Sequence, residues 1–588
     1  MADQRVLRIG NCSGFYGDRL SAMRELLEGG PVDVITGDYL AELTMLILGK
    51  DTMKDPTLGY ARTFVTQVEQ SLGLALERGV KIVANAGGLN PAGLATRLRE
   101  VAAGLGLSPR IAHVEGDDLR ALGFPGALTA NAYLGGFGIA SALAAGADIV
   151  VTGRVTDASL VVGPAVAHFG WQPTAYDELA GAVVAGHVIE CGAQATGGNF
   201  SGFLALPRTG RPLGFPVAEV AADGSCVITK HDGTGGAVTV DTVTAQLFYE
   251  IASPRYLGPD VTTRLDTVEV TQAGPDRVAV AGVRGEPPPE RLKVCVNELG
   301  GFRNSAEFVL TGLDVPAKAA WVREQLAPAL TAASVTWTLT DTARPGADTE
   351  EAASARLRCT VMDPSPEKVG RAFTGPAVEL ALASYPGFTM TAPPAPGTPY
   401  GVYRAEYVDR SAVTHTVVHP DGRHEVIPNP PAAEAHGEGG PGLGGLAWSA
   451  RSEARAEGVD PAVGPPSPGV AGATVTVPLG TFVHARSGDK GGDANLGLWV
   501  GHDDPDRRPA RVAWLLGVVT PEWVRELLPE AAGLDVEVHP LPNLGGVNVV
   551  LHGLLGLGVA ASTRFDPQAK GLGEWARSRT VEIPEELL

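Results

Sequence analysis

The fold of the first two hundred residues is decided by a unit that is clearest in the stretch Lys81-Ile82-Val83-Ala84-Asn85-Ala86-Gly87-Gly88-Leu89-Asn90-Pro91. A short apolar run ends in a Gly/Asn loop, and the helix-compatible segment Pro91–Gly104 follows, with proline where a helix can begin. The same order recurs after the runs Val6–Ile9, Val32–Ile35, Ile111–Val114 and Asp148–Val151. Runs without a polar face that alternate with helices are typical of a parallel sheet covered on both sides. We therefore expect residues 1–205 to form an α/β domain with a mostly parallel, doubly wound sheet.

Polar loops follow these runs, at the edge where open parallel sheets bind their ligands. Tandem glycines can turn backbone N–H groups toward one point, and a helix N-terminus behind them favours a phosphate or carboxylate. A tight turn with asparagine caps explains the loop Asn85–Asn90 equally well. The candidate anion-binding residues in the loops of the first three runs are Asn11, Ser13, Asn85, Gly87, Gly88 and Asn90.

The loop Thr152–Ser159 follows the last of the apolar runs. Thr156 or Asp157 could cap the next helix, but capping leaves Arg154 unexplained. An arginine at the carboxyl end of a strand suits a carboxylate or phosphate. We expect Arg154 to orient an anionic substrate and Asp157 or Asp38 to move a proton.

Two further Gly-rich loops have the same character. Gly192–Phe200 contains Thr196, Gly197, Gly198 and Asn199, and Thr229–Gly236 contains Lys230, Asp232, Gly235 and Gly236. In the second loop a lysine, a histidine and an aspartate cluster beside the glycines. We expect both loops to contribute to anion binding.

Downstream of Phe203, alternating segments such as Cys226–Lys230, Ala237–Val243 and Thr267–Thr271 predict antiparallel β structure. Residues 294–410 show strands and helices in the order of a split β-α-β, or ferredoxin-like, unit, with Val402–Val408 as the last strand. We expect an α+β region over 206–428, a Pro/Gly-rich linker over 429–472, and a C-terminal ferredoxin-like α+β domain over 473–588.

The segment Ala485–Asn495 is the richest in polar residues. Its acids, bases and glycines stand between two apolar strands, and it is longer than a hairpin loop needs to be, which favours a ligand or interface role. Arg486 or Lys490 could hold an anion, and Asp489 or Asp493 could act as a base or acceptor. With Asn495, these residues complete the predicted site, in which Asp38, Asp157, Asp489 and Lys490 are the catalytic candidates.

Composition excludes several function classes. The 588 residues carry 46 Lys+Arg and 66 Asp+Glu, a formal charge of −20, with no basic block, so nucleic acid and anionic membranes are unsuitable partners. The 5 cysteines show no C-x-x-C spacing, which argues against a disulfide framework or thiolate zinc site and fits a reducing cytoplasm. The chain also lacks the P-loop, G-x-S-x-G and H-E-x-x-H patterns. His415 and His419 could share a strand face, but we interpret them as part of an exposed hairpin and expect no metal site.

Taken together, these segments resemble the acyclic terpene utilisation proteins of the AtuA type. The resemblance rests on Gly10–Gly17, Gly37–Glu42, Asn85–Pro91, Glu115–Asp118, Gly146–Ser159, Glu190–Phe203, Lys230–Gly236, Ala381–Phe388 and, most specifically, Ala485–Gly497. It implies an N-terminal α/β region, a C-terminal ferredoxin-like domain, and a role in breaking down acyclic terpenoid acids such as citronellate and geranylate through acyl-CoA intermediates.

Three functional hypotheses follow. The first is a cytoplasmic enzyme, a homo-oligomer, that acts as a lyase or hydratase on a small carboxylate or acyl-CoA thioester by acid–base catalysis. It would either add or remove water or cleave a C–C bond beside the carbonyl group. Coenzyme A would then enter as part of the substrate, and we expect no other cofactor. The second is a noncatalytic partner or scaffold subunit that docks another enzyme through its C-terminal domain. The third is a metal-dependent enzyme with Asp, His and Glu ligands.

Overall fold

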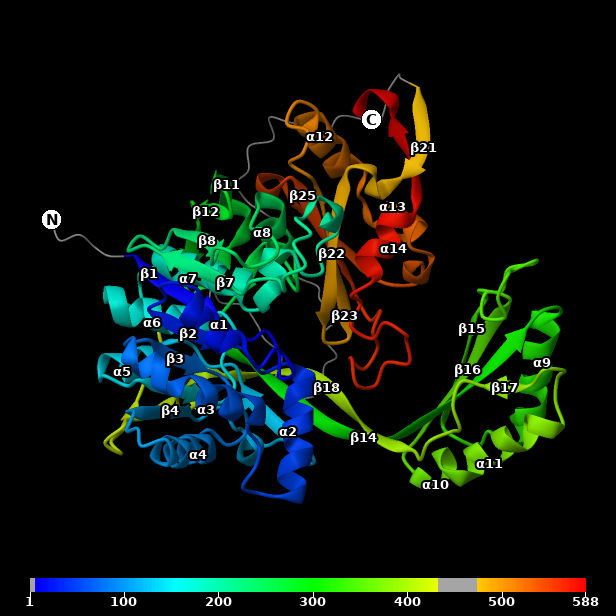
Figure 1. The fold of residues 1–588 in the computed structure, drawn as a ribbon, viewed down its shortest axis with the longest axis horizontal. Coiled ribbons are helices and arrows are strands. Elements are labelled where there is room, and N and C mark those ends of the chain that lie inside the picture. The colour runs from blue at the N-terminus through cyan, green and yellow to red at the C-terminus, as the bar shows by residue number, and fades with distance from the viewer. Residues whose placement is uncertain (1–5, 432–472) are drawn as a thin grey trace, which may run out of the picture.

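The computed structural model describes residues 6–431 and 473–588. The expected linker therefore lies outside the described residues, apart from its first three positions, 429–431. Within the described residues, one large sheet forms the body, the C-terminal unit packs against it, and a smaller unit stands apart at the end of a long strand (Figure 1).

The centre of the body is the expected parallel sheet. Its strands are β1 (Leu7–Asn11), β2 (Val34–Gly37), β3 (Lys81–Ala84), β6 (Ile149–Thr152) and β4 (Ile111–Glu115), which lie side by side in that order. All the apolar runs of the sequence are thus confirmed as strands.

Helices cover both faces of this sheet, as a doubly wound fold requires. One face packs against α1 (Ala22–Gly29), α3 (Arg62–Glu77) and α4 (Pro91–Gly104), whose apolar residues share one core with Ile35 and Ile82. The other face packs against α5 (Phe137–Ala144), α6 (Ser159–Phe169) and α7 (Tyr176–Ile189) in a second core. A further helix, α2 (Glu42–Lys54), follows β2.

The sheet continues beyond residue 205 with antiparallel strands. Next to β1 lie β7 (Pro216–Val220), β8 (Cys226–Lys230), β12 (Arg277–Ala281) and β11 (Glu269–Gly274), and next to β4 lie β19 (Thr416–Val418) and β20 (His424–Val426). The expected boundary between 205 and 206 therefore falls between strands of one eleven-stranded sheet of the described residues. β7 pairs with β1 and β19 pairs with β4, although both come much later in the chain than their partners.

One predicted strand of this region is wrong. Ala237–Val243 runs into helix α8 (Val240–Leu247), because Thr239 and Thr242 form a reciprocal capping box that starts a helix there. A small sheet of β9 (Arg255–Leu257), β10 (Thr262–Arg264) and β13 (Arg284–Glu286) packs beside α7.

The strand β14 (Arg291–Thr311) carries the outlying unit. Its first half pairs with β5 (Thr129–Ala132) and β18 (Thr398–Asp409) in the body, and its second half pairs with β16 (Ser354–Asp363) and β17 (Thr389–Met390) (Figure 1).

The outlying unit has the ferredoxin-like strand order that the sequence predicts. The order is β15-β16-β14-β17, with β15 at Ser334–Thr340, and the covering helices are α9 (Val315–Leu326), α10 (Pro366–Val369) and α11 (Arg371–Glu379). Its fourth strand is the short β17 and not the expected Val402–Val408, which lies in β18 and pairs with the half of β14 that belongs to the body.

The C-terminal unit is the expected ferredoxin-like α+β module. Its sheet has the order β22-β23-β25-β24, formed by Val483–Lys490, Asp493–Val500, Gly546–Leu551 and Val536–Leu541. Its helices are α12 (Arg508–Val518), α13 (Pro521–Leu527) and α14 (Leu572–Ser578), and β21 (Thr474–Pro478) pairs with β26 (Thr580–Pro584).

The prediction of a long loop at Ala485–Asn495 is wrong. β22 runs to Lys490 and β23 starts at Asp493, so only Gly491 and Gly492 form the turn. The polar residues are strand residues, and they are polar because the hairpin β22–β23 packs against polar groups of the body.

Several contacts fix this hairpin to the body. The indole of Trp499 stacks on Phe248 at a centroid distance of 5.7 Å. Asn495 donates to the carbonyl of Phe248 at 2.7 Å and accepts from the amide of Glu250 at 2.9 Å. A Cβ at position 497 would lie 2.4 Å from the Cβ of Phe248, so glycine is required there. The hairpin therefore forms one packed assembly with the body.

Candidate functional site

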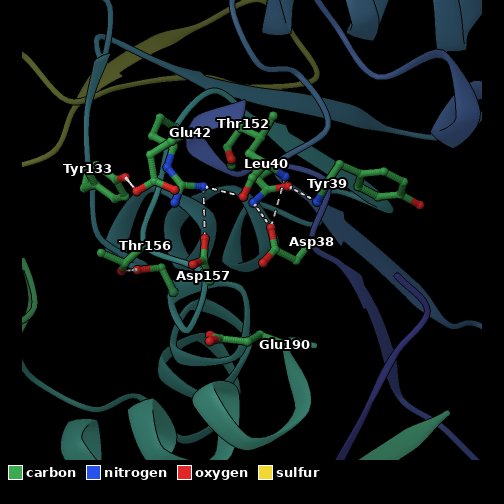
Figure 2. Close-up of polar contacts among 12 residues, drawn as sticks. Asp38, Tyr39, Leu40, Glu42, Tyr133, Thr152, Thr156, Asp157 and Glu190 are labelled. Carbon is green, nitrogen blue, oxygen red and sulfur yellow. Dashed lines mark hydrogen bonds and ion pairs between the residues drawn. The ribbon is translucent and has the colours of Figure 1, made fainter. Parts of the chain in front are cut away.

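A buried group of charged side chains gathers where the hairpin meets the body. It is built by the residues after β2, β3 and β6, by the end of α7, by the segment after α8, and by the hairpin. Figure 2 shows the part of the group that contains Asp38, Asp157 and Glu190. The loops after β2, β3 and β6 meet at this place because parallel strands share one carboxyl edge.

Asp38 follows β2 and is held by the loop after β3. Its carboxylate accepts a 2.6 Å hydrogen bond from the Asn85 side chain, whose oxygen accepts from the amide of Tyr39 at 2.7 Å. Burial raises the pKa of Asp38 well above its ordinary value, and Asp157 raises it further, while Arg154 and Asn85 lower it. Asn85 thus positions an acid in the site.

Arg154 stands at the centre of the group, 2% exposed. Its Nη1 contacts Asp157 at 3.0 Å and donates to the carbonyl of Leu40 at 3.0 Å, and its guanidinium lies 4.3 Å from the ring centroid of Tyr133 (Figure 2). Its Nε has no hydrogen-bond partner among the described residues. Arg154 therefore compensates the neighbouring carboxylates and retains one unused donor.

Glu42 forms the side of the site nearest β14. It accepts a hydrogen bond from the Tyr133 hydroxyl at 3.0 Å, and Lys293 lies 3.7 Å away. Burial alone would raise the pKa of Glu42, but Lys293 and Arg154 outweigh burial and hold this pKa at about 2. Glu42 is therefore a permanent anion at neutral pH.

At the end of α7, His187 and Glu190 form a buried pair. Nδ1 of His187 lies 3.2 Å from Oε1 of Glu190, and the imidazole packs 5.1 Å from the ring centroid of Tyr256. Asn11, the last residue of β1, donates to the main-chain carbonyl of Glu190 at 2.7 Å. The strand end thus fixes the helix end in the site.

The hairpin adds Asp489 and Lys490. Burial lowers the pKa of the Lys490 ammonium, and Lys293 lowers it further, while Glu250 raises it. Burial raises the pKa of Asp489 to about 8, and Glu250 contributes to this shift. Burial also raises the pKa of Glu250 to about 7, and Glu42 and Asp157 contribute to that shift. Near neutral pH the site therefore holds carboxyl groups that still carry protons.

Arg486 and Lys570 line the hairpin's other contact with the body. Arg486 donates to the carbonyl of Asn199 at 3.1 Å and to the side chain of Gln194, and it stacks on Tyr249 at 4.1 Å. Lys570 contacts the Tyr249 hydroxyl and lies 3.5 Å from Glu250. These two cations join the two units beside Glu250.

A cleft opens next to this group. It has about 280 Å³ of free space, part of it open to solvent, and its polar lining residues include Glu42, Tyr403 and Asp489. Its apolar lining residues include Leu43, Leu46 and Val559. A small molecule with a polar and an apolar end matches this lining.

Asn90, Gly87 and Gly88 contact other parts of the fold. Asn90 caps α4 by accepting from the amide of Gly93 at 2.9 Å. The amides of Gly88, Leu89 and Asn90 donate to backbone carbonyls, and a Cβ at Gly87 would lie 2.4 Å from the carbonyl oxygen of Thr152. The turn-and-cap interpretation describes these contacts, and the amides of Gly88, Leu89 and Asn90 are used within the fold.

The Gly-rich loop before Phe200 is also engaged within the fold. Thr196 donates to the carbonyl of Gly214 at 2.7 Å, and the amides of Gly197 and Gly198 donate to backbone carbonyls. The carbonyl of Asn199 accepts from Arg486. This loop receives the hairpin, and the amides of Gly197 and Gly198 are used within the fold.

The side chains of the remaining candidates make other contacts within the fold or are exposed. Lys230 pairs with Asp276 at 3.0 Å, Asp232 is exposed, and Asp493 accepts from His552 at 3.0 Å. Gly235 and Gly236 pack tightly on backbone carbonyls, and Ser13 donates to the carbonyl of Phe15 at 2.9 Å.

Several members of the group were not predicted from the sequence. They are Glu42, Tyr133, His187, Glu190, Glu250, Tyr256, Lys293 and Lys570. The clearest overlooked signal is Glu190, an acid that directly follows the buried run Leu179–Ile189.

The described residues contain no group of three or more His, Cys, Asp or Glu side chains arranged to hold a metal ion. His419 is buried and pairs with Glu425 at 2.8 Å, so the expectation of an exposed hairpin is wrong for that residue. The partner residue Glu425 lies on β20, which is an edge strand of the large sheet. Within the described residues no helix is long and apolar enough to cross a membrane.

Comparison with known proteins identifies the family. Neither the curated proteins nor the solved structures contain a significant match to this chain. The family model described as acyclic terpene utilisation family protein AtuA matches residues 7–419, and the model for the AtuA ferredoxin-like domain matches residues 477–582. The two matches cover the body with its outlying unit and the C-terminal module, so the chain belongs to the acyclic terpene utilisation family AtuA.

Proposed function

We propose that this chain is a cytoplasmic enzyme of acyclic terpenoid or related branched carboxylic acid breakdown. Its substrate is a small carboxylate or acyl thioester, and its reaction adds or removes water beside the carbonyl group. The proposal is carried by one observation: the buried charged group is assembled by two separate units, and both cations and protonated carboxyl groups face one another in it.

The cations suit an anionic or strongly polarised substrate. Lys293 and Lys490 influence the same carboxyl groups as Arg154, and all three lie beside the cleft residue Glu42. A positive group at a carboxylate or thioester carbonyl stabilises the negative charge that develops there when the neighbouring carbon loses a proton.

The carboxyl groups suit proton transfer. Asp38, Asp489 and Glu250 have raised pKa values because they are buried among other acids. An acid that keeps its proton near neutral pH can give it to a leaving hydroxyl group, and the resulting carboxylate can then act as a base. Elimination and addition of water need both steps.

A noncatalytic scaffold would need a C-terminal module that is free to dock a partner. Here the hairpin face of the module is covered by Phe248, Tyr249 and Glu250 of the body, and it supplies Asp489 and Lys490 to the charged group. This arrangement supports the enzyme over the scaffold.

The test begins with a panel of acyl-CoA thioesters and hydroxy acids. A true ligand raises the melting temperature because it binds the native state only, and stabilising compounds are then assayed for water addition or loss. Asp157→Asn, Asp489→Asn and Lys490→Met should each lower kcat about 100-fold or more. The matched control Asp118→Asn removes an exposed aspartate paired with Arg120 and should leave turnover unchanged. Normal turnover in all three site variants would overturn the assignment.

A further inference from the structure

His187 and Glu190 form a pair of buried titratable side chains within the charged group. His187 is 3% and Glu190 is 7% exposed, and both stand at the end of the buried helix α7. Their contact joins Nδ1 of His187 to Oε1 of Glu190 at 3.2 Å. The two residues are therefore held together in an environment from which water is largely excluded.

The second oxygen of Glu190 is unused. Oε2 is buried and has no hydrogen-bond partner among the described residues. A buried polar atom without a partner costs about 1–3 kcal/mol, and native proteins rarely accept this cost without a reason. A bound substrate that exchanges a proton with Oε2 would supply that reason.

The backbone of Glu190 is anchored more firmly than a helix end requires. The Asn11 side chain donates to the carbonyls of Ser13, Ile189 and Glu190, and the Asn11 oxygen accepts from Thr36 at 3.1 Å. A Cβ at Gly14 would lie 2.7 Å from the backbone of Cys191, so the chain also approaches closely on the other side. Such anchoring fixes where the Glu190 carboxyl group can lie.

The surroundings set the charge of this carboxyl group. The groups that act on it from other elements are Asp38, Arg154, Asp157, Glu250, Tyr256 and Lys490. Burial, Asp157 and Glu250 raise the pKa of Glu190 well above its ordinary value, and burial and Lys490 lower the pKa of His187 to about 4. The surroundings therefore favour the neutral form of both members of the pair. In Figure 2, Glu190 lies on the same side of the group as Asp157.

We propose that Glu190 is the proton-transfer residue of the site and that His187 is its positioning residue, which holds Oε1 so that Oε2 meets the substrate. This inference rests on the proposed function and deepens it. The protonated Oε2 gives its proton to the leaving hydroxyl group, which departs as water with the electron pair of the C–O bond. The carboxylate then takes the proton from the carbon beside the carbonyl, and the electron pair of that C–H bond closes the C=C bond. Glu190 ends protonated, as it began.

The experiment uses the full-length protein and the panel compound that the wild type turns over. Glu190→Gln keeps the shape but cannot transfer a proton, so kcat should fall about 1,000-fold while the melting temperature and the stabilisation by substrate stay close to wild type. Glu178→Gln, at the opposite end of the same helix, is the matched control and should leave kcat unchanged.

The positioning role is tested at His187. His187→Phe removes the contact with Oε1, so kcat should fall about 10- to 100-fold with little change in KM, and the pH dependence of kcat should shift. His187→Asn places an amide nitrogen near the position of Nδ1 and should restore most of the activity. If Glu190→Gln does not fold, the comparison of His187→Phe with His187→Asn still tests the proposal.

The outcomes separate the two proposals. If the wild type turns over a panel compound and Glu190→Gln retains kcat within about tenfold, the Glu190 assignment is overturned and the proposed function stands. Equal kcat and pH profiles for His187→Phe and His187→Asn would overturn the positioning role. If the wild type turns over no member of the panel, the proposed function falls first, and the Glu190 assignment falls with it.

Discussion

The side chain of Asn11 donates a 2.7 Å hydrogen bond to the main-chain carbonyl of Glu190, which lies 179 residues later in the chain. The same side-chain amide also donates to the carbonyls of Ser13 and Ile189. A single residue at the end of β1 therefore fixes the end of α7 and, with it, one wall of the charged group.

Replacing Asn11 should affect both stability and activity. Asn11→Ala leaves buried carbonyls without a donor and should lower the free energy of unfolding by about 2–3 kcal/mol. Because Glu190 is no longer anchored, kcat should fall more than substrate affinity. Denaturation midpoints and steady-state kinetics measure the two effects.

The control for this prediction is Asn90→Ala. Asn90 also bonds to backbone with its side chain, but it caps α4 away from the charged group. Loss of this cap should cost about 1 kcal/mol and leave kcat unchanged. A similar loss of kcat in both variants would mean that Asn11 acts only through general stability.

Removing the central cation should be costly in a pH-dependent way. Arg154→Met leaves Asp157 and Asp38 without their compensating charge, and breaking such a buried pair should cost about 3–5 kcal/mol at pH 7. The deficit should shrink in acid, because burial raises the pKa of Asp38, and its protonated carboxyl group no longer needs a compensating charge. Arg120→Met, which breaks the exposed pair with Asp118, should cost about 0–1 kcal/mol. A deficit for Arg154→Met that does not depend on pH would contradict this account.

The strands of the parallel sheet could be predicted because each is a local pattern. The runs before Asn11, Asp38 and Asn85 are apolar, short and followed by polar loops, and these features suffice. β5 (Thr129–Ala132) could not be predicted, since its partner is β14, and Thr129 bonds to Asn297 across 168 residues. Nothing in its own four residues signals that pairing.

The site was predictable to the extent that its residues interrupt apolar strands. Asp38, Arg154, Asp489 and Lys490 stand at strand ends and could be selected on that basis. Glu250 could not, because it becomes part of the group only when Asn495 of the hairpin binds its amide. The role of the Gly-rich loops could not be decided from the sequence, since a turn that uses its amides internally has the same sequence as one that offers them to a ligand.

Two acids of the site should change stability in opposite directions with pH. Asp489 has a pKa of about 8 in the native state, whereas an aspartate of the unfolded chain loses its proton near pH 4. Between about pH 4 and pH 8 the native state therefore binds a proton that the unfolded chain has released. Stability from this group is therefore lost as the pH rises through that interval. Asp489→Asn removes the loss and should raise the free energy of unfolding by about 1–2 kcal/mol near pH 8, with little effect near pH 4.

Glu42 provides the opposite case. Its pKa of about 2 lies below that of the unfolded chain, so its contribution to stability is present above about pH 4.5 and is lost as the pH falls toward 2. Glu42→Gln should cost about 1–3 kcal/mol at pH 7 and progressively less in acid. Denaturation midpoints across pH test both variants, and parallel curves for mutant and wild type would contradict the assignments.

The attachment of the hairpin depends on the orientation of one amide. In Asn495 the nitrogen donates to the carbonyl of Phe248 and to the side-chain oxygen of Asn548, both at 2.7 Å, while the oxygen accepts from Glu250. Asn495→Asp places an oxygen where the nitrogen was, so two acceptors would face a buried carboxylate. The free energy of unfolding should fall by about 2–4 kcal/mol at pH 7 and recover partly in acid.

The same variant should separate docking from catalysis when it is compared with Asn543→Asp. Asn543 also joins the C-terminal module to the body, through the carbonyls of Leu265 and Val268 at 2.9 Å, but it lies near the end of β23 that is remote from the turn. Both variants weaken the interface, yet Asn495→Asp should displace Asp489 and Lys490 and reduce kcat far more. Equal losses of kcat at equal losses of stability would show that the hairpin is a structural support and that the reacting groups all belong to the body.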